Sequence, residues 1–379
     1  MKKNILVLNS YYDKNPFLID FIRVLEAGAY NFFLFSSPAG LIDSFCEYKW
    51  GYKKIYLGPK IESKLDLCKF NLLYFPLFFV HFFVLLINKY KYKFETIICL
   101  NWNEKLIYSP LAKLFGIKMV WLERPDINYR TYPSQLLKFY KFFSKDVKII
   151  TTIDKSKIQL KSLGFNDENI FVIHPAIKVK KEAKHQDSIF EELAKKERPK
   201  FKQKYFTLGV VTDYEYPNQI ESLLHVIKIC QTMIPNIQLI IVGDGESKKQ
   251  VAWTAKKMEI DNLTWFVGWQ SNLKKWLDSF DIYITSAEIV KLMDIKLLLK
   301  VMSYELPVVS FKDIGYNNFI YENETGLMSE LGDSEMLAQN ILKLYNNKLL
   351  ITKFGRQGRE LVLEKFDIEK QAKKFEEIL

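Results

Sequence analysis

The amino-acid sequence predicts an α/β protein built from two doubly wound parallel sheets. Short apolar runs rich in β-branched and aromatic residues alternate with helical stretches along most of the chain. Most of these runs lack an alternation of apolar and polar residues, which is typical of parallel strands covered by helices on both faces. The pattern starts again after a lysine-rich segment, and 379 residues is the length of about two domains.

The first domain is expected to span residues 1–177. Its expected strands are residues 4–8, 32–35, 55–57, 96–100, 119–122, 149–151 and 170–173. Its clearest helical stretches are residues 17–26, 70–88 and 104–115. Strand, helix and strand in repetition favour a doubly wound sheet, in which ligands usually bind at the carboxyl ends of the strands.

Residues 178–204 form the expected boundary between the domains. They hold ten Lys or Arg and five acidic residues, which is a net charge of +5 out of the chain's +11. We interpret them as a solvated basic linker with a helical patch near residues 188–196.

The second domain is expected to span residues 205–366. Its expected strands are residues 205–211, 237–242, 263–267, 282–285 and 306–310. Its expected helices are residues 218–233, which are amphipathic, and 296–304. Two such sheets joined by a linker would leave a cleft between them.

Composition narrows the functional classes. Hydrophobic residues make up 49% of the chain and charged residues 26%, which excludes a disordered or collagen-like protein. The four cysteines form no C-x-x-C pair, which fits a reducing compartment, and the four histidines lack metal-ligand spacing. The net charge of +11 predicts an anionic partner, such as a membrane surface, a nucleotide or a nucleic acid.

Residues 70–88 are uncharged and about long enough to span a bilayer. Pro76 is expected to break the early part, and the polar His81 in the middle also counts against a span. We favour a helix buried in the α/β core. An in-plane helix with its aromatic face in lipid is the alternative, and a buried helix with one membrane-touching face satisfies both. Acidic headgroups would then meet the flanking lysines, which are Lys64, Lys69, Lys89, Lys91 and Lys93.

Common nucleotide-binding motifs are missing from the sequence. Asn9-Ser10-Tyr11-Tyr12 follows the first strand without a G-x-G-x-x-G pattern, and no P-loop occurs, so NAD and Walker-type sites are disfavoured. The MKKNILVLNSYY segment has too short an apolar run for a signal peptide. Gly243-Asp244-Gly245, after a strand, is either a tight turn or part of a ligand site.

The second half carries a series of motifs in a fixed order. They are I-I-V-G-D-G-E, N-L-T-W-F-V-G-W, D-I-Y-I-T-S, K-V-M-S-Y-E-L-P-V-V-S, T-G-L and a terminal F-D-I-E-K. In the first half, P-L-A-K-L-F-G-I-K-M-V-W-L-E and D-E-N-I-F-V-I-H-P-A-I agree with them. This order resembles the retaining glycosyltransferases of family 4 (group 1). The resemblance implies the GT-B fold, with two Rossmann-like domains, an interdomain cleft and a C-terminal crossover helix, residues 367–379, that packs on the N-terminal domain.

Several donor-site positions depart from that family. The Arg and Lys that usually hold the donor diphosphate correspond to Asp213 and Asn218, and a carboxylate repels a diphosphate. The usual two glutamates correspond to Leu292 and Lys300. The resemblance leaves Glu288, or Asp294, for the first of these roles if the loop is shifted.

The first domain departs as well. Residues 13–16 replace the family's glycine-rich loop, and Arg124 stands where a histidine is common. Lys296 and Lys300, four residues apart on one helix face, would supply the missing positive charge together with Arg124, unless they are ordinary surface lysines. The donor-binding candidates are Gly243, Asp244, Gly245, Trp269, Ser286, Glu288, Lys296, Lys300 and Asn218.

The acceptor would bind to the first domain. Asn101-Trp102-Asn103-Glu104 follows a strand and opens a helix, so Trp102 would stack on a sugar and Glu104 would accept hydroxyl hydrogen bonds; helix capping is the alternative. Glu123-Arg124 is either a local ion pair or an acid and a phosphate clamp. The acceptor-side candidates are Tyr11, Tyr12, Asn101, Trp102, Glu104, Glu123 and Arg124.

The resemblance implies a retaining, hexosyltransferase-type transfer from a nucleotide sugar to a lipid-linked or polysaccharide acceptor in envelope glycan assembly. No metal or cofactor is expected, because cationic side chains and helix N-termini would neutralise the leaving diphosphate. A catalytically decayed GT-B protein that binds a glycan or a partner is the alternative. Nucleic-acid binding is disfavoured, because no reading motif occurs. We expect a cytoplasmic protein, peripheral on the inner face of the plasma membrane if residues 70–88 touch lipid.

Overall fold

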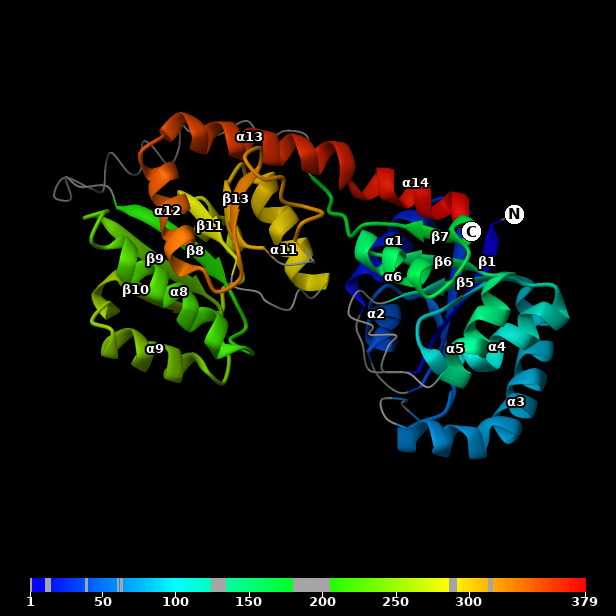
Figure 1. Ribbon diagram of the computed structural model, residues 1–379. Coiled ribbons are helices and arrows are strands. Elements are labelled where there is room, and N and C mark those ends of the chain that lie inside the picture. The colour runs from blue at the N-terminus through cyan, green and yellow to red at the C-terminus, as the bar shows by residue number, and fades with distance from the viewer. Residues whose placement is uncertain are drawn as a thin grey trace. The chain divides into compact units, whose positions relative to one another are not determined.

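The computed structural model describes residues 2–10, 15–37, 40–59, 61, 64–123, 134–179, 205–285, 292–312 and 316–379. The chain divides into two compact units: Met1–Ala176 with Ile368–Leu379, and Ile177–Asp367. Each unit contains one parallel sheet with helices packed on it (Figure 1).

The first unit contains the strands β1 (Lys3–Asn9), β2 (Tyr30–Ser36), β3 (Gly51–Lys54), β4 (Phe94–Cys99), β5 (Lys118–Leu122), β6 (Lys148–Thr151) and β7 (Ile170–Val172). In the described part of the unit they form one sheet in the order β3-β2-β1-β4-β5-β6-β7. Its helices are α1 (Pro16–Glu26), α2 (Leu41–Glu47), α3 (Lys64–Tyr92), α4 (Trp102–Phe115), α5 (Ser134–Ser144), α6 (Asp154–Ser162) and α14 (Ile368–Ile378).

The first unit is held together by two sets of contacts. Leu6 and Leu8 of β1 pack with Tyr108 of α4 in a core that also takes in α3 and α5. The C-terminal helix α14 packs on α1, where the rings of Phe21 and Phe375 stack 5.4 Å apart. The last residues of the chain therefore complete the unit that its first residues begin.

The second unit contains the strands β8 (Phe206–Val211), β9 (Ile237–Val242), β10 (Thr264–Gly268), β11 (Ile282–Ile284), β12 (Val308–Phe311) and β13 (Gly326–Ser329). Within the described residues they form a sheet in the order β10-β9-β8-β11-β12-β13. Its helices are α8 (Pro217–Cys230), α9 (Lys248–Lys257), α10 (Leu273–Leu277), α11 (Leu292–Ser303), α12 (Ser334–Tyr345) and α13 (Lys348–Lys365).

One expected strand is wrong. Residues 55–57 were expected to pair, but β3 is the exposed Gly51–Lys54, which pairs with β2 from Phe33↔Gly51 to Ser36↔Lys54. An edge strand is held by backbone hydrogen bonds on one side only, so its side chains need not be apolar. The apolar Ile55 and Leu57 follow the strand instead, and Leu57 is buried.

The helix expected at residues 70–88 differs from the prediction in two ways. It is longer, Lys64–Tyr92, and it continues through Pro76. Pro76 lies on the exposed side of the helix, as does Leu72, whose carbonyl group has no N–H from Pro76 to accept. Moreover, the helix is not a buried core helix, because only 17% of its most apolar window is buried. One side of α3 packs on the core and the other is exposed.

The remaining expected elements lie within a few residues of those observed, except that the helical patch at residues 188–196 lies outside the described residues. Local caps explain some boundaries. Asn15 accepts a hydrogen bond from the Leu18 backbone at the start of α1, and Gly116 ends α4 in a left-handed conformation. The strand β13 and the helices α2, α5, α6, α9, α10, α12 and α13 were not predicted.

Candidate functional site

The turn between β9 and α9 has no space for side chains at its two glycines. Gly243 has φ +136°, and a Cβ atom there would lie 1.8 Å from the Thr212 carbonyl oxygen. A Cβ atom on Gly245 would lie 2.0 Å from the Asp213 carbonyl oxygen. The β9–α9 turn and the loop after β8 therefore pack backbone to backbone, at the carboxyl ends of two adjacent strands.

The loop after β8 contains a buried tyrosine in a rare conformation. Tyr214 has φ +56° and is 1% exposed, and its hydroxyl has no hydrogen-bond partner among the described residues. Burial raises the pKa of this hydroxyl, and the negative charge of Asp244 raises it further. Asp213, the residue at the usual arginine position, is exposed, and its carboxylate accepts a hydrogen bond from the Glu215 backbone.

A third segment joins the turn from β10. The Gly243 backbone donates a hydrogen bond of 2.9 Å to the carbonyl group of Gly268. Trp269, the next residue, is 73% exposed. Lys248 in the first turn of α9 places its amino group 3.6 Å from the Asp244 carboxylate. The structure thus brings Gly243, Asp244 and Gly245 together with Trp269 and adds a lysine that we did not predict.

The other donor-side candidates lie on other elements or outside the described residues. Asn218 is exposed in the first turn of α8. On α11, Lys300 is exposed and Lys296 is partly buried. Ser286 and Glu288 lie outside the described residues.

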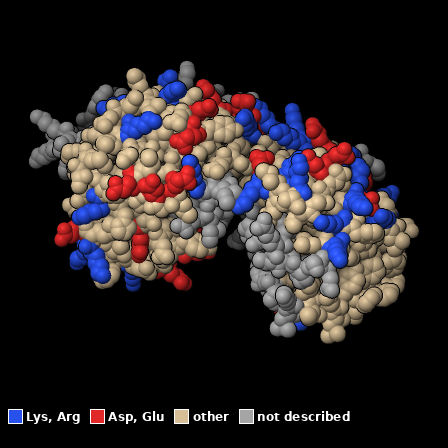
Figure 2. All heavy atoms as spheres, viewed as in Figure 1, with Lys and Arg blue, Asp and Glu red and all other residues tan. Residues whose placement is uncertain are grey.

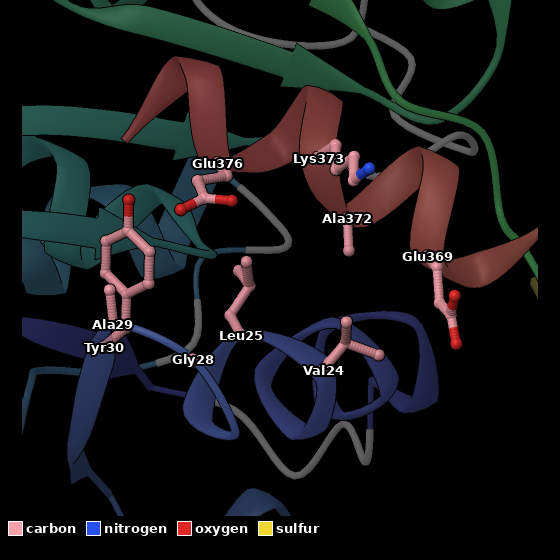
Figure 3. Close-up of a pocket in the computed structure, with 9 residues that line it drawn as sticks. All are labelled: Val24, Leu25, Gly28, Ala29, Tyr30, Glu369, Ala372, Lys373 and Glu376. Carbon is pink, nitrogen blue, oxygen red and sulfur yellow. The ribbon is translucent and has the colours of Figure 1, made fainter.

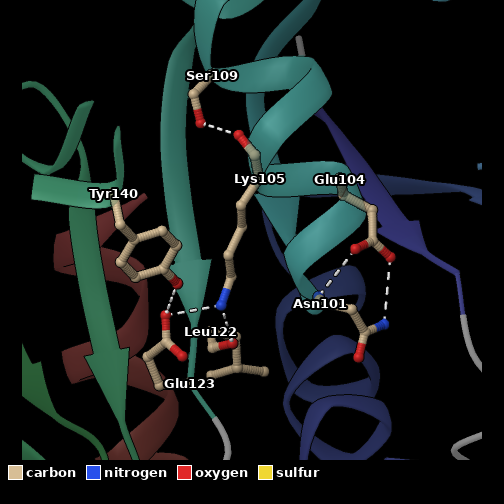
Figure 4. Close-up of polar contacts among 7 residues, drawn as sticks. All are labelled: Asn101, Glu104, Lys105, Ser109, Leu122, Glu123 and Tyr140. Atoms are coloured by element: carbon tan, nitrogen blue, oxygen red, sulfur yellow. Dashed lines mark hydrogen bonds and ion pairs between the residues drawn. The ribbon is translucent and has the colours of Figure 1, made fainter. Parts of the chain in front are cut away.

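In the first unit, Asn101 and Glu104 at the start of α4 belong to a buried polar network (Figure 4). The Glu104 carboxylate is fully buried and accepts hydrogen bonds from the backbone of Asn101, 3.0 Å, from its side-chain amide, 3.2 Å, and from the Ser10 backbone. The capping interpretation of Glu104 is therefore confirmed. Burial raises the pKa of this carboxyl group, and the hydrogen bonds from Asn101 and Ser10 oppose the rise.

Glu123, at the end of β5, belongs to a second buried group (Figure 4). Lys105 lies 2.7 Å from its Oε1 atom, with both side chains at most 1% exposed. The hydroxyl of Tyr140 donates to the same oxygen, and Lys105 also donates to the carbonyl group of Leu122 at 3.3 Å. The second oxygen, Oε2, has no hydrogen-bond partner among the described residues.

These contacts change the interpretation of the acceptor-side candidates. Trp102 is 3% exposed and packs on the Tyr140 ring with centroids 4.4 Å apart, so its face is not available to a sugar in this conformation. Glu123 pairs with Lys105, whereas Arg124 lies outside the described residues, as do Tyr11 and Tyr12.

Sequence reasoning missed Lys105, Tyr140, Tyr214 and Lys248. For Lys248 a signal existed, because it follows Asp244 by four residues at the start of a helix. For Lys105 the residue type predicts an exposed side chain, since a lysine is almost never fully buried without a partner.

A pocket of about 260 Å³ lies elsewhere in the first unit, between α1 and α14 (Figure 3). Its lining includes Tyr30, the first residue of β2, together with Glu369, Lys373 and Glu376. It therefore lies at the amino end of the strands, opposite the edge where ligands usually bind in such sheets. Within the described ranges, no group of three or more His, Cys, Asp or Glu is placed to hold a metal ion.

Comparison with known proteins finds a family match in the second unit, where the sequence motifs lie. Residues 205–347 match the family model described as glycosyl transferases group 1. The chain is 27% identical over 136 residues to the lipopolysaccharide core biosynthesis glycosyltransferase LpsE of Rhizobium meliloti, covering 36% of this chain and 39% of that protein. It is 24% identical over 207 residues to the poly(ribitol-phosphate) alpha-N-acetylglucosaminyltransferase of Staphylococcus aureus, covering 54% and 38%. These alignments span less than half the length of either relative.

The fold is shared over the whole chain. The Anabaena protein Alr3699/HepE, whose crystal structure is a complex with UDP, superimposes with a TM-score of 0.77 at 13% identity, covering 100% of this chain and 99% of that one. The predicted fold, α/β with two Rossmann-like parallel-sheet domains of the GT-B type, is confirmed.

Proposed function

We propose that this protein, whose residues 205–347 match the group 1 glycosyltransferases, transfers a sugar from a nucleotide-sugar donor to a lipid-linked or polysaccharide acceptor. One named relative is a glycosyltransferase of lipopolysaccharide core biosynthesis and the other is a poly(ribitol-phosphate) alpha-N-acetylglucosaminyltransferase, which supports a role in envelope glycan assembly. The proposal includes retention of configuration and independence from metal ions.

The observation that carries the proposal is the glycine turn at Gly243 and Gly245. Its two glycines let the turn pack backbone to backbone on the loop after β8, and this holds the turn at the carboxyl ends of β8 and β9, where ligands bind in doubly wound sheets. The exposed ring of Trp269 adjoins it and offers a flat surface to a base or a sugar. The alignment with a structure that contains UDP supports a nucleotide as the ligand class.

The charged side chains of the second unit give weaker support for a diphosphate as part of the ligand. Lys248 and Lys300 are the cations we assign to it, aided by the positive end of the dipole of α8, which begins at Pro217. The exposed carboxylates of Asp213 and Asp244 oppose them. Neutralisation by lysine and helix termini requires no metal ion.

The partners follow from the same proposal. We propose a nucleotide sugar and a glycan or lipid-linked acceptor as ligands, no nucleic acid, and a cytoplasmic protein that contacts the inner face of the plasma membrane. One helix of the described chain, Asp66–Tyr92, is long and apolar enough to cross a membrane by length and composition.

A second candidate is a catalytically decayed protein of the same fold that binds a glycan or a partner enzyme. The exposed carboxylate of Asp213, in place of the expected cation, favours it. Such a protein would keep the glycine turn and lose affinity for nucleoside diphosphates.

Isothermal titration separates the two candidates. UDP-, GDP- and ADP-sugars are titrated with the free diphosphates as controls, and the active candidate predicts heat with one of them. Lys248→Ala and Lys300→Ala should each weaken that binding about tenfold, since a hydrogen bond to a charged group is worth about 1.5–3 kcal/mol. Lys256→Ala, an exposed lysine in the last turn of α9, should not change it. Absence of heat with every donor would support the decayed candidate.

A further inference from the structure

The middle of the helix α3 is mostly apolar all round, yet only one side of it is covered. Residues 70–88 contain no charged residue. The buried side is made by Phe70, Leu77, His81, Leu85 and Asn88. The opposite side exposes between 39% and 83% of each side chain at Leu72, Leu73, Phe75, Phe79, Val80, Phe83 and Ile87, with Tyr90 beyond them at 79%. A helix that is apolar all round is expected in a core or in lipid, and α3 is half in a core.

The exposed side chains form one stripe along the helix. Leu72, Phe75, Phe79, Phe83 and Ile87 are spaced by three or four residues, which places them on a single helix face. We call these five residues the α3 stripe. In Figure 2, the part of the first unit that corresponds to α3 in Figure 1 shows a broad area with few charged side chains. Contiguous apolar patches of this kind mark interaction sites on soluble proteins.

The buried side of α3 ties the helix to the first unit and argues against a membrane span. His81 lies 2.9 Å from the Tyr108 hydroxyl through Nδ1 and 3.0 Å from the Tyr56 carbonyl oxygen through Nε2. Burial lowers the pKa of His81, which favours its neutral form. A span would separate α3 from α4 and leave these polar groups without partners in lipid.

Positive charge flanks the stripe without interrupting it. Lys69 precedes it, with 60% of its side chain exposed and its amino group 3.9 Å from the Asp66 carboxylate, and Lys91 and Lys93 follow it, both exposed. An apolar helix face bordered by lysines is the arrangement of helices that lie in the plane of a membrane interface and meet anionic headgroups. The chain's net charge of +11 acts in the same direction.

We propose that the α3 stripe docks on an anionic phospholipid bilayer, with the helix lying in the plane of the surface. A second copy of the chain fits the stripe less well. In a two-fold dimer with antiparallel α3 helices, the lysines at one end would face those at the other end of the partner helix, and like charges repel. The purpose of this docking rests on the proposed function, because a membrane surface presents a lipid-linked acceptor. The docking itself requires neither the donor nor the acceptor.

Flotation with vesicles tests the docking on the full chain. The vesicles contain phosphatidylcholine alone or phosphatidylcholine with phosphatidylglycerol, and no nucleotide is added. The wild-type protein should bind the anionic vesicles at least about tenfold more strongly, since each lysine near such a surface adds about 1 kcal/mol. Phe79→Ser with Phe83→Ser should weaken that binding at least about tenfold, because burying one phenylalanine is worth about 1.5–3 kcal/mol.

A control removes apolar groups of the second unit that are at least about as exposed as Phe79 and Phe83. Trp253→Ser with Leu349→Ser changes side chains that are 58% and 84% exposed on α9 and α13, and it should leave vesicle binding unchanged. Lys91→Glu with Lys93→Glu should abolish the preference for anionic vesicles. If the paired phenylalanine variant fails to fold by circular dichroism, Leu72→Ser with Ile87→Ser tests the two ends of the same stripe.

Three results would overturn the proposal. They are the absence of binding by the wild-type protein, equal binding by the wild-type and stripe variants, and a lipid-free dimer in light scattering that the stripe variants dissociate, because a second copy would then cover the stripe. Donor titration with the same stripe variants keeps the two proposals separate. Loss of vesicle binding with normal donor heat concerns only the docking, whereas absence of donor heat in a protein that binds vesicles contradicts only the transferase.

Discussion

Replacing Lys105 by methionine should destabilise the first unit severely, although it removes no apolar contact. The lysine amino group lies 2.7 Å from Glu123 Oε1, and both side chains are at most 1% exposed. After the change, the Glu123 carboxylate would stay buried with the Tyr140 hydroxyl as its remaining hydrogen-bond partner among the described residues. Removing one partner of a buried ion pair typically lowers the free energy of unfolding by about 3–5 kcal/mol.

Urea unfolding followed by circular dichroism measures this loss. With a denaturant slope of about 2–3 kcal/mol per molar, the midpoint for Lys105→Met should fall by about 1–2 M. The control is Lys113→Met on the same helix, since Lys113 pairs with Asp146 at 2.6 Å with more than half of each side chain exposed. An exposed pair contributes about 0–1 kcal/mol, so this variant should unfold almost as the wild-type protein does.

The double variant Lys105→Met with Glu123→Leu distinguishes a stranded charge from lost packing. Replacing both partners of a buried pair by apolar groups is often close to neutral, so the double variant should recover most of the stability that Lys105→Met loses. If Lys105→Met costs no more than Lys113→Met, or if the double variant is as unstable as the single one, the buried charge is not the cause and the reasoning fails.

Three further predictions concern other parts of the fold. Burial raises the pKa of Glu104, so the native state binds this proton more tightly than the unfolded chain does, and the wild-type protein should lose stability as the pH rises from 4.5 through the folded-state pKa. In Glu104→Gln this part of the pH dependence should vanish from a series of urea midpoints, and an unchanged slope would contradict it. Gly243→Ala should lower the free energy of unfolding of the second unit by about 3 kcal/mol or more, because its Cβ atom meets the Thr212 carbonyl oxygen. The control Gly332→Ala, at φ +82° with open space around it, should cost only about 1–2 kcal/mol. Equal shifts of the two melting temperatures would refute the packing argument. Phe375→Ala should cost about 3–5 kcal/mol in calorimetry, since the ring is fully buried against α1, and a loss below about 1 kcal/mol would show that α14 is not an integral part of the first unit.

Some of the candidate site could be predicted because its signal is local. Gly243 and Gly245 follow a strand, and a glycine at such a position indicates a turn whatever lies around it. The capping role of Glu104 follows equally from its position three residues after Asn101. What these residues contact could not be predicted, because Asp213 and Thr212 approach the turn from another strand.

Sequence reasoning failed where burial and charge depend on distant segments. Glu123 was interpreted together with Arg124, as a local ion pair or as an acid beside a phosphate clamp, and neither interpretation included the buried cation Lys105 that contacts it. Stacking of Trp102 on a sugar was one of two interpretations of the start of α4, and the ring of Tyr140 from α5 that packs on Trp102 could not be foreseen. For residues 70–88 we favoured a helix buried in the core and left open a helix with one exposed face, because composition alone does not say how much of an apolar surface a sheet can cover.

The sequence by itself determined the alternation of strands and helices and the two parallel sheets, because hydrophobic periodicity and turn residues act over a few residues at a time. Only the tertiary structure decided that Lys105 neutralises Glu123, that α14 packs on α1, and that the α3 stripe stays uncovered. Each of these depends on which surfaces meet when segments far apart in the chain pack together. That packing decides which groups lose contact with water, and this desolvation sets the energy of a buried charge or of an exposed apolar face.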